Sequence, residues 1–350
     1  MASRLLPTNL TVNSSGNATF TRPPSVSVYI SHHRSLIVWT VAVLTINLIG
    51  ALANILTFIA TLTYRPLRKS SSCLLLAHCI LLDTFITVVT EIGAVLVTLF
   101  GDRLFPAHFC QAWGVFVFGP TFVGNWAHAL LAFNRFVAAT FPHQYRRSTA
   151  RPVLLATIII PWVISVVVNV FPVAGNRVRF EMMWPWAGCM VQPLESLAQQ
   201  LVTSFGTYIP CLVTGMCYTS VLIRSRLSVR RRVGEGSRST VLNQRYEVSK
   251  MLFACFLWYC GANFTLPAAV TFFPRLYFSS PLTQLAFKGL QYVSSAVNPV
   301  FFIAVSKNYR DGVILVMTCR ITATNGAVGT RGMVTFPRTS QKSSVRSSTK

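Results

Sequence analysis

The fold class of this chain follows from one segment, "LFPAHFCQAWGVFVFGPTFVGNWAHALLAFNR", residues 104–135. Its first 31 residues, Leu104 to Asn134, contain no Lys, Arg, Asp or Glu, and Arg135 ends the run. About 20 residues of α-helix cross the hydrocarbon core of a bilayer. The segment is therefore long enough to span a membrane, and Arg135 lies at its end.

Windows of the same kind recur along all 350 residues, which are 52% hydrophobic and only 11% charged. Soluble domains have about 25% charged residues. Four more windows lack charges and two contain isolated ones: Ser35–Tyr64, Pro152–Asn176, Ser196–Ile223, Met251–Pro274, Ser70–Gly101 and Leu276–Ser306. A very apolar soluble core is the alternative, but its helices would be shorter and keep a polar face. We therefore predict an all-α membrane protein with seven transmembrane helices.

The basic loops predict the orientation of the bundle. Lys and Arg gather after the first, third and fifth spans, at residues 65–69, 146–151 and 224–250. Such loops face the cytoplasm, so an odd number of spans places the N-terminus outside the cell. Three clustered glycosylation sequons, at Asn9, Asn13 and Asn17, agree with this orientation. We expect a multi-pass protein of the plasma membrane.

The segments outside the spans have their own predicted structure. We expect residues 1–34 to form a disordered, glycosylated extracellular arm and residues 35–306 to form the seven-helix domain. Residues 307–319 combine apolar positions with basic flanks, which favours an amphipathic helix on the membrane surface. Cys319 at its end is either a palmitoylation site or a free cytosolic thiol. Residues 320–350 lack hydrophobic periodicity and predict a disordered cytoplasmic tail.

The net charge of +23 first suggests a nucleic-acid partner. The excess lies in the cytoplasmic loops and the tail, without interleaved aromatics that would stack on bases. Anionic membrane lipid is therefore the expected partner, and nucleic acid is not. Nucleotide-binding, metal-binding and nucleophile motifs are missing from the sequence, so neither an enzyme nor a metal site is predicted. His78 and His128 lie within spans, where packed, hydrogen-bonded histidines are expected more than proton sensors.

Two of the nine cysteines fall on the predicted extracellular side, Cys110 and Cys189. An oxidising compartment and an even number of cysteines predict a disulfide between them. This bridge would tie the loop between spans four and five across the mouth of the bundle.

Seven spans with Cys110, Arg135 twenty-five residues later and Asn298-Pro299 in the last span resemble a rhodopsin-like (class A) G-protein-coupled receptor. Further landmarks at the family's spacing are Asn54, Asp83, Pro142, Trp162, Pro172, Pro210, Tyr218 and Trp258. The resemblance covers all seven spans. It implies a receptor that binds an extracellular ligand and activates a heterotrimeric G protein.

The resemblance also assigns the surface that contacts the G protein. Outward movement of spans five and six would expose Arg135. The coupling residues expected from it are Arg135, Asn134, Pro142, Tyr218 and Arg224. A phosphorylated tail would provide a second site, for arrestin.

The interior of the bundle should contain the polar residues. A carboxylate such as Asp83 is costly in hydrocarbon, so it should face inward and meet polar partners. The resemblance implies that these partners are Asn54, Ser295 and Asn298. In the family this cluster holds a sodium ion, but Gly124 stands where a polar ligand is expected. We therefore expect no strong sodium site. The other switch residues that the resemblance implies are Pro210, Trp258, Pro299 and Phe302.

Several substitutions concern the switch itself. Asn134 replaces the acid that usually precedes Arg135, and Thr240 replaces the acid of span six, so the inactive-state ion pairs are missing. Phe302 replaces a tyrosine and cannot donate a hydrogen bond toward Tyr218. Further replaced positions are Asn125, Ala254 and Cys260. These changes predict basal activity.

The expected pocket excludes two ligand classes. Val117 stands where aminergic receptors carry a carboxylate, and Tyr292 where opsins carry the lysine that binds retinal. Lys288 lies one turn further out, where it would pair with Glu91 or with an anionic ligand group, or extend to the outer interface. We expect Val117, Glu91, Lys288 and Tyr292 to line a largely apolar pocket together with Trp258 and Tyr259. Such a pocket would fit a small-molecule, lipid-like or peptide ligand.

Two rival functions follow from other features. A transporter would place charges or broken helices near the midplane of two repeated halves, and no such repeat is seen here. A receptor-like partner that dimerises with signalling receptors without signalling itself fits the altered switch residues.

Overall fold

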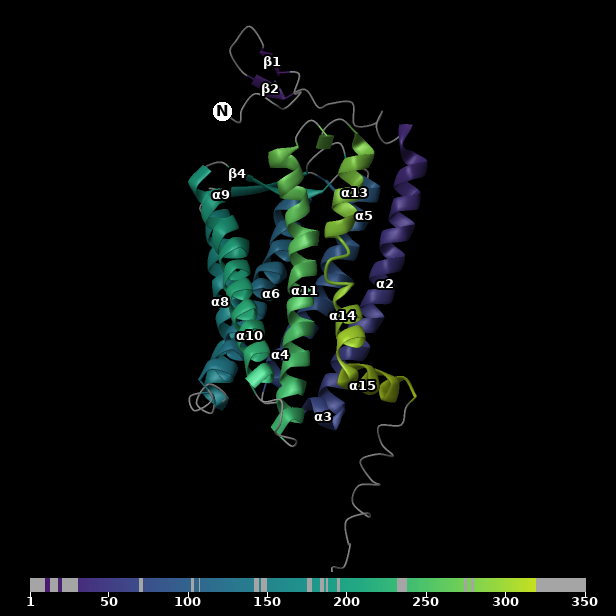
Figure 1. Cartoon of the computed structure of the whole chain (residues 1–350). Coiled ribbons are helices and arrows are strands. Elements are labelled where there is room, and N and C mark those ends of the chain that lie inside the picture. The colour runs from purple at the N-terminus through teal and green to yellow at the C-terminus, as the bar shows by residue number, and fades with distance from the viewer. Residues whose placement is uncertain are drawn as a thin grey trace, which may run out of the picture.

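The computed structural model shows an elongated bundle of helices with a hairpin at one end (Figure 1). It describes residues 10–12, 18–20, 31–68, 72–101, 104–106, 108–141, 145, 150–174, 178–182, 186, 188–193, 196–231, 238–273, 276–277 and 280–318. The predicted sites at Asn9, Asn13, Asn17, Pro142 and Cys319 lie outside these residues.

Seven segments of the chain run along the bundle. The first is α2 (His33–Thr63). The second is one continuous helical segment made of α4 (Cys73–Phe85), η1 (Ile86–Glu91) and α5 (Ile92–Phe100). The third and fourth are α6 (Phe109–Thr140) and α8 (Arg151–Ala174). The fifth consists of α9 (Ser196–Thr203), η3 (Ser204–Tyr208) and α10 (Ile209–Arg231). In the described residues these five are long and apolar enough to cross a bilayer. The last two are α11 (Arg238–Phe272) and the broken pair α13 (Pro281–Gln291) and α14 (Asn298–Val305).

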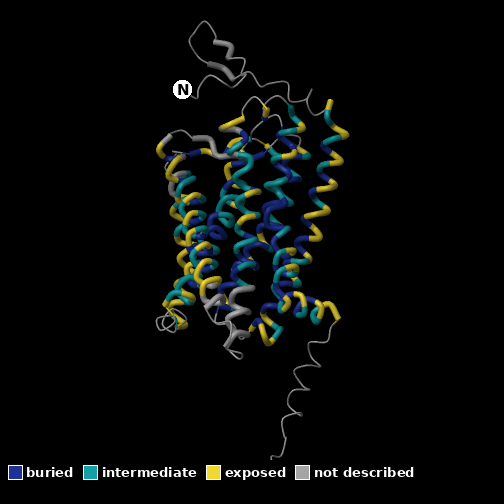
Figure 2. Tube along the Cα trace, viewed as in Figure 1, coloured by how far each residue is buried: buried dark blue, intermediate teal, exposed yellow. Residues whose placement is uncertain are grey.

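Exposed positions lie along the outside of the bundle and buried ones between the helices (Figure 2). Large apolar side chains are common among the exposed residues, and polar residues are found among the buried ones. Val38 and Ile49 of α2, Val167 of α8 and Leu212 of α10 are all more than half exposed. Asp83, by contrast, is 3% exposed. Hydrocarbon solvates such an outer surface, and polar groups then bond to one another inside. This distribution is the one a membrane-spanning bundle requires.

Helix α2 makes an unusually close approach to the last span. A Cβ built on Gly50 would lie 2.5 Å from both Cβ and the backbone oxygen of Ala296. Only glycine allows this approach without displacement of the neighbouring backbone. Asn47 and Asn54 lie three and four residues away on the same helical face, so the contact also brings their amides to the backbone of the last span.

Two hairpins and a surface helix lie at the ends of the bundle. Strands β3 (Val178–Met182) and β4 (Cys189–Pro193) pair antiparallel, and the Cys110–Cys189 disulfide ties β4 to the first turn of α6. We call this the disulfide end. Helix α15 (Lys307–Met317) lies across the opposite end, the Arg135 end (Figure 1).

The N-terminal arm was expected to lack regular structure. Instead, β1 (Leu10–Val12) and β2 (Ala18–Phe20) form a short antiparallel hairpin in it. The expectation of disorder was wrong for these six residues. Alternating apolar and hydroxyl residues, as in Leu10-Thr11-Val12, suit a strand.

The main apolar core lies toward the Arg135 end. It includes Leu131, Tyr218, Met251, Phe302 and Tyr309, all at most 2% exposed. Smaller apolar clusters lie toward the disulfide end. This distribution leaves room for a cavity between the helices above the main core.

Candidate functional site

A cavity of about 420 Å³ lies between the helices beneath β4. Gly188 and Cys189 are part of its ceiling, and its lining extends inward to Asp83, Tyr218 and Phe302. Ligand cavities usually have volumes of about 300–1,000 Å³ and mostly apolar walls. Of the residues expected in a pocket, Val117, Glu91, Tyr259 and Tyr292 line this cavity. Trp258 and Lys288 lie outside its lining. They donate hydrogen bonds to the backbone oxygens of Ser294 and Trp186.

A π-helical turn in the second span aligns two acidic residues. Eight residues of regular α-helix would place Glu91 about 80° around the axis from Asp83. The extra residue in η1, Ile86–Glu91, reduces this angle to about 20°. Both carboxylates therefore face the interior, and both line the cavity.

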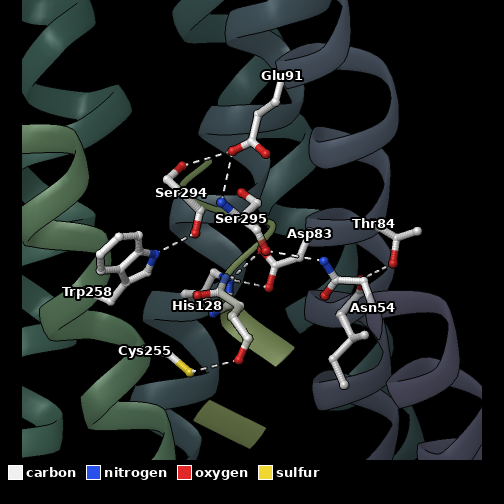
Figure 3. A network of polar contacts seen from close by, with 11 residues as sticks. Asn54, Asp83, Thr84, Glu91, His128, Cys255, Trp258, Ser294 and Ser295 are labelled. Carbon is white, nitrogen blue, oxygen red and sulfur yellow. Dashed lines mark hydrogen bonds and ion pairs between the residues drawn. The ribbon is translucent and has the colours of Figure 1, made fainter. Parts of the chain in front are cut away.

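Asp83 is the centre of a buried polar network (Figure 3). Nδ2 of Asn298 donates to Oδ2 of Asp83 at 3.0 Å, and Nε2 of His128 lies 3.4 Å from Oδ1. Asn54 was expected to bind this carboxylate, but its Nδ2 donates to the backbone oxygen of Ser295 at 3.2 Å. Pro299 lacks the N–H that would bond to this oxygen in a helix, so the oxygen needs another donor.

The residues around Asp83 do not fit the sodium cage that the resemblance implies. A hard cation prefers several oxygen ligands, whereas the His128 ring occupies one side of the carboxylate and Gly124 offers no side-chain oxygen. Within the described ranges, no three His, Cys, Asp or Glu side chains lie close enough to bind a metal. His78, the other histidine within a span, accepts from Nε1 of Trp162 at 3.4 Å. Both histidines are therefore hydrogen-bonded.

The last span is not helical between Gln291 and Asn298, and side chains of other spans bind its backbone. Asn47 donates to the oxygen of Tyr292 at 2.8 Å, and Nε1 of Trp258 donates to that of Ser294 at 2.8 Å. A broken helix inside a membrane requires such partners. Trp258 thus holds the break in place from span six.

Glu91 also binds to the break. Its Oε1 accepts from Oγ of Ser294 at 3.0 Å and from the backbone nitrogen of Ser295 at 2.9 Å. The prediction that Lys288 pairs with Glu91 was wrong, because Nζ of Lys288 donates to the backbone oxygen of Trp186 at 2.6 Å. Extension of Lys288 to the outer interface was also wrong, since the residue is only 8% exposed. The break brings the serines to Glu91, while α13 holds Lys288 beneath the loop.

Pro210 leaves carbonyl groups without helical partners in the fifth span. Nδ2 of Asn125 donates to the oxygen of Gly206 at 2.9 Å, and Nε1 of Trp126 donates to that of Phe205 at 2.8 Å. These oxygens are four and five residues before Pro210, which has no N–H to offer them. The altered residue Asn125 therefore joins span three to the π-helical turn η3.

At the Arg135 end, Asn134 and Arg135 have separate surroundings. Oγ of Ser72 donates to Oδ1 of Asn134 at 2.9 Å and lies 3.2 Å from the hydroxyl of Tyr145. Arg135 is half-buried, and its Nε has no partner among the described residues. Arg224 is exposed on α10, and Thr240 lies in α11 with a side chain outside the description.

Two aromatic residues that the resemblance assigns to the switch are buried near this end. Tyr218 is 2% exposed and its hydroxyl has no partner in the described part of the chain. The Phe302 ring lies 5.0 Å from the Tyr309 ring, and Oγ1 of Thr61 donates to the Tyr309 hydroxyl at 3.3 Å. Burial raises the pKa of the Tyr309 hydroxyl, which keeps it neutral. Phe302 thus packs where it has no hydroxyl to offer Tyr218.

Comparison with known proteins agrees with this architecture. Residues 53–302 match the family model described as "7 transmembrane receptor (rhodopsin family)". Neuropeptide receptor 15 of Caenorhabditis elegans is 23% identical over 308 residues, which cover 78% of this chain and 88% of the relative. The predicted seven-helix bundle is confirmed.

Proposed function

Because this chain belongs to the rhodopsin family of seven-transmembrane receptors, we propose that it transmits the binding of an extracellular ligand to a heterotrimeric G protein. Receptors of this family are multi-pass membrane proteins and not enzymes. One observation carries the proposal: a single cavity extends from the tethered hairpin at the disulfide end to Tyr218 and Phe302. A ligand that binds one arrangement of these walls better shifts the packing next to Arg135.

The proposed orientation places the disulfide end outside the plasma membrane. A disulfide persists in an oxidising compartment, and the basic loops belong on the cytoplasmic side. Arg135 then lies at the cytoplasmic surface, half-buried between the helices. Outward movement of α10 and α11 would expose it to the G protein.

The volume of the cavity limits the size of the group that enters it. About 420 Å³ accommodates one drug-sized group. The relative is named a neuropeptide receptor, and a peptide ligand would insert one end while the remainder contacts the β3–β4 hairpin. Val117 and Tyr292 in the walls support the prediction that neither a biogenic amine held on span three nor a retinal Schiff base is bound.

G-protein activation in cells without added ligand tests this function. We expect the wild-type chain to exceed the vector background with at least one class of G protein, and Arg135→Ala to return to background at equal surface level. Arg151→Ala is a matched control, because Arg151 is an exposed arginine at the start of α8. Background signal for wild type across all classes, with ligand-containing tissue extract as well as without it, would support the non-signalling dimerisation partner instead.

A further inference from the structure

The cavity wall contains a carboxylate of which only one oxygen is bound. Oε1 of Glu91 accepts two hydrogen bonds, from Ser294 and Ser295. Oε2 is buried and has no partner among the described residues, and Glu91 as a whole is 4% exposed. The preceding residue, Thr90, also lines the cavity, and its buried hydroxyl has no partner in the described part of the chain. Two adjacent residues of η1 therefore present unmatched polar atoms at one place in the wall.

An unmatched carboxylate oxygen inside a helix bundle is energetically unfavourable. Desolvation of an ionised carboxylate costs several kcal/mol unless donors or a cation compensate it, and two donors on Oε1 compensate only part of the charge. The backbone of the last span holds Glu91 in this position, so the carboxylate cannot turn to another partner without breaking the Ser294 and Ser295 bonds. The described residues therefore offer Oε2 no donor, and a group that enters the cavity can supply one.

The charges around the cavity favour a cationic donor. Asp83 and Glu91 both line it, together with His128, and no Lys or Arg is among the described lining residues. The ammonium of Lys288 lies just outside the ceiling of the cavity: a Cβ built on Gly188 would be 2.9 Å from Nζ of Lys288. This Nζ donates to the backbone oxygen of Trp186. Its charge faces the loop carbonyl. The walls of the cavity are therefore acidic, and the nearby ammonium of Lys288 is hydrogen-bonded to the loop above it.

We propose that the cavity binds ligands through a guanidinium or primary ammonium group that donates to Oε2 of Glu91. The rest of the ligand would lie against the apolar wall formed by Val97, Trp113, Val117 and Phe118. The anchoring acid is on span two, whereas span three offers only Val117 at the aminergic position. The proposal rests on the proposed function for its role as a receptor ligand site, and on the geometry of Glu91 for its chemistry.

Thermal unfolding of the purified full-length receptor in lipid nanodiscs tests the charge preference directly. The probes share one apolar group: 3-phenylpropylguanidinium, 3-phenylpropylammonium, the neutral 3-phenylpropan-1-ol and the anionic 4-phenylbutyrate. We expect both cations at millimolar concentration to raise the unfolding midpoint with saturation, while the alcohol and the anion do not. Equal effects of cation and alcohol, or no effect of any probe, would overturn the proposal without any variant.

Variants then locate the effect. Glu91→Gln keeps an oxygen for Ser294 and Ser295 but removes the charge, and it should weaken cation binding by about 30-fold or more. Glu181→Gln removes an exposed acid of β3 at the same end of the molecule and should leave binding unchanged. A Glu91→Gln receptor that responds to the cations as wild type does would overturn the assignment. A receptor that binds cations through Glu91 but never activates a G protein would instead overturn the proposed function.

Discussion

The Ser72 hydroxyl donates to Oδ1 of Asn134 at 2.9 Å, and both side chains are buried. Asn134 occupies the place where the family usually has the acid next to Arg135. Here it ties span three to the start of span two, and no described residue forms an ion pair with Arg135. Among the described residues, packing therefore holds Arg135 in place, and no neighbouring charge does.

Asn134→Asp should lower basal signalling. A carboxylate next to Arg135 would restore an ion pair that stabilises the resting state, and a partly exposed pair contributes about 0.5–1 kcal/mol. We expect ligand-free G-protein activation to fall about two- to five-fold at matched surface level. Ser72→Ala is the control, since it removes the hydrogen bond of Asn134 without adding a charge. Basal signal that is equal in wild type and Asn134→Asp would contradict this account of Arg135.

His128→Leu should destabilise the receptor, because it leaves Oδ1 of Asp83 without its partner. Loss of a hydrogen-bond partner in a buried site costs about 1–3 kcal/mol, so the unfolding midpoint should fall by about 2 °C or more. Replacing sodium by choline should leave the wild-type midpoint unchanged, since His128 lies where the cage would close. His108→Leu, at an exposed position before α6, is the matched control. A sodium-dependent wild-type midpoint would show that a cation does share this site.

Cys110→Ala or Cys189→Ala should reduce the amount of receptor at the cell surface. The bridge closes a loop between residues 79 positions apart, and loss of a native disulfide typically costs about 2–5 kcal/mol. Flow cytometry of an N-terminal epitope would measure this loss. Cys73→Ala removes a free, half-buried cysteine and should leave surface levels near wild type. Unchanged surface levels in either bridge variant would mean that the disulfide contributes little to stability.

Asn125→Leu should destabilise the fifth span. The substitution leaves the oxygen of Gly206 without its side-chain donor next to Pro210, at a cost of about 1–3 kcal/mol. The unfolding midpoint in nanodiscs should fall, while Asn263→Leu, which removes only a bond to Tyr259 within the same helix, should have a smaller effect. An equal effect of the two variants would argue against a special role for Asn125.

The seven-helix class and the disulfide pair follow from local properties of the chain. The length of a charge-free window reflects bilayer thickness, and Cys110 and Cys189 were the cysteines on the predicted outer side. The need of Asp83 for interior partners was also predictable, because any carboxylate in hydrocarbon requires them. Even the bond from Asn54 to Ser295 had a signal, since Pro299 deprives that oxygen of its helical donor.

The partners of Glu91 and Lys288 had no such signal. The π-helical turn in span two rotates Glu91 toward the cavity, and the break after Gln291 presents Ser294 and Ser295 to it. Neither irregularity changes the hydrophobic period enough to be read from one chain. Hydropathy depends on each residue and its near neighbours, whereas hydrogen-bond partners depend on helix rotation and packing between segments more than 200 residues apart. The membrane bundle is therefore a property of the local sequence, and the acidic cavity is a product of its assembly.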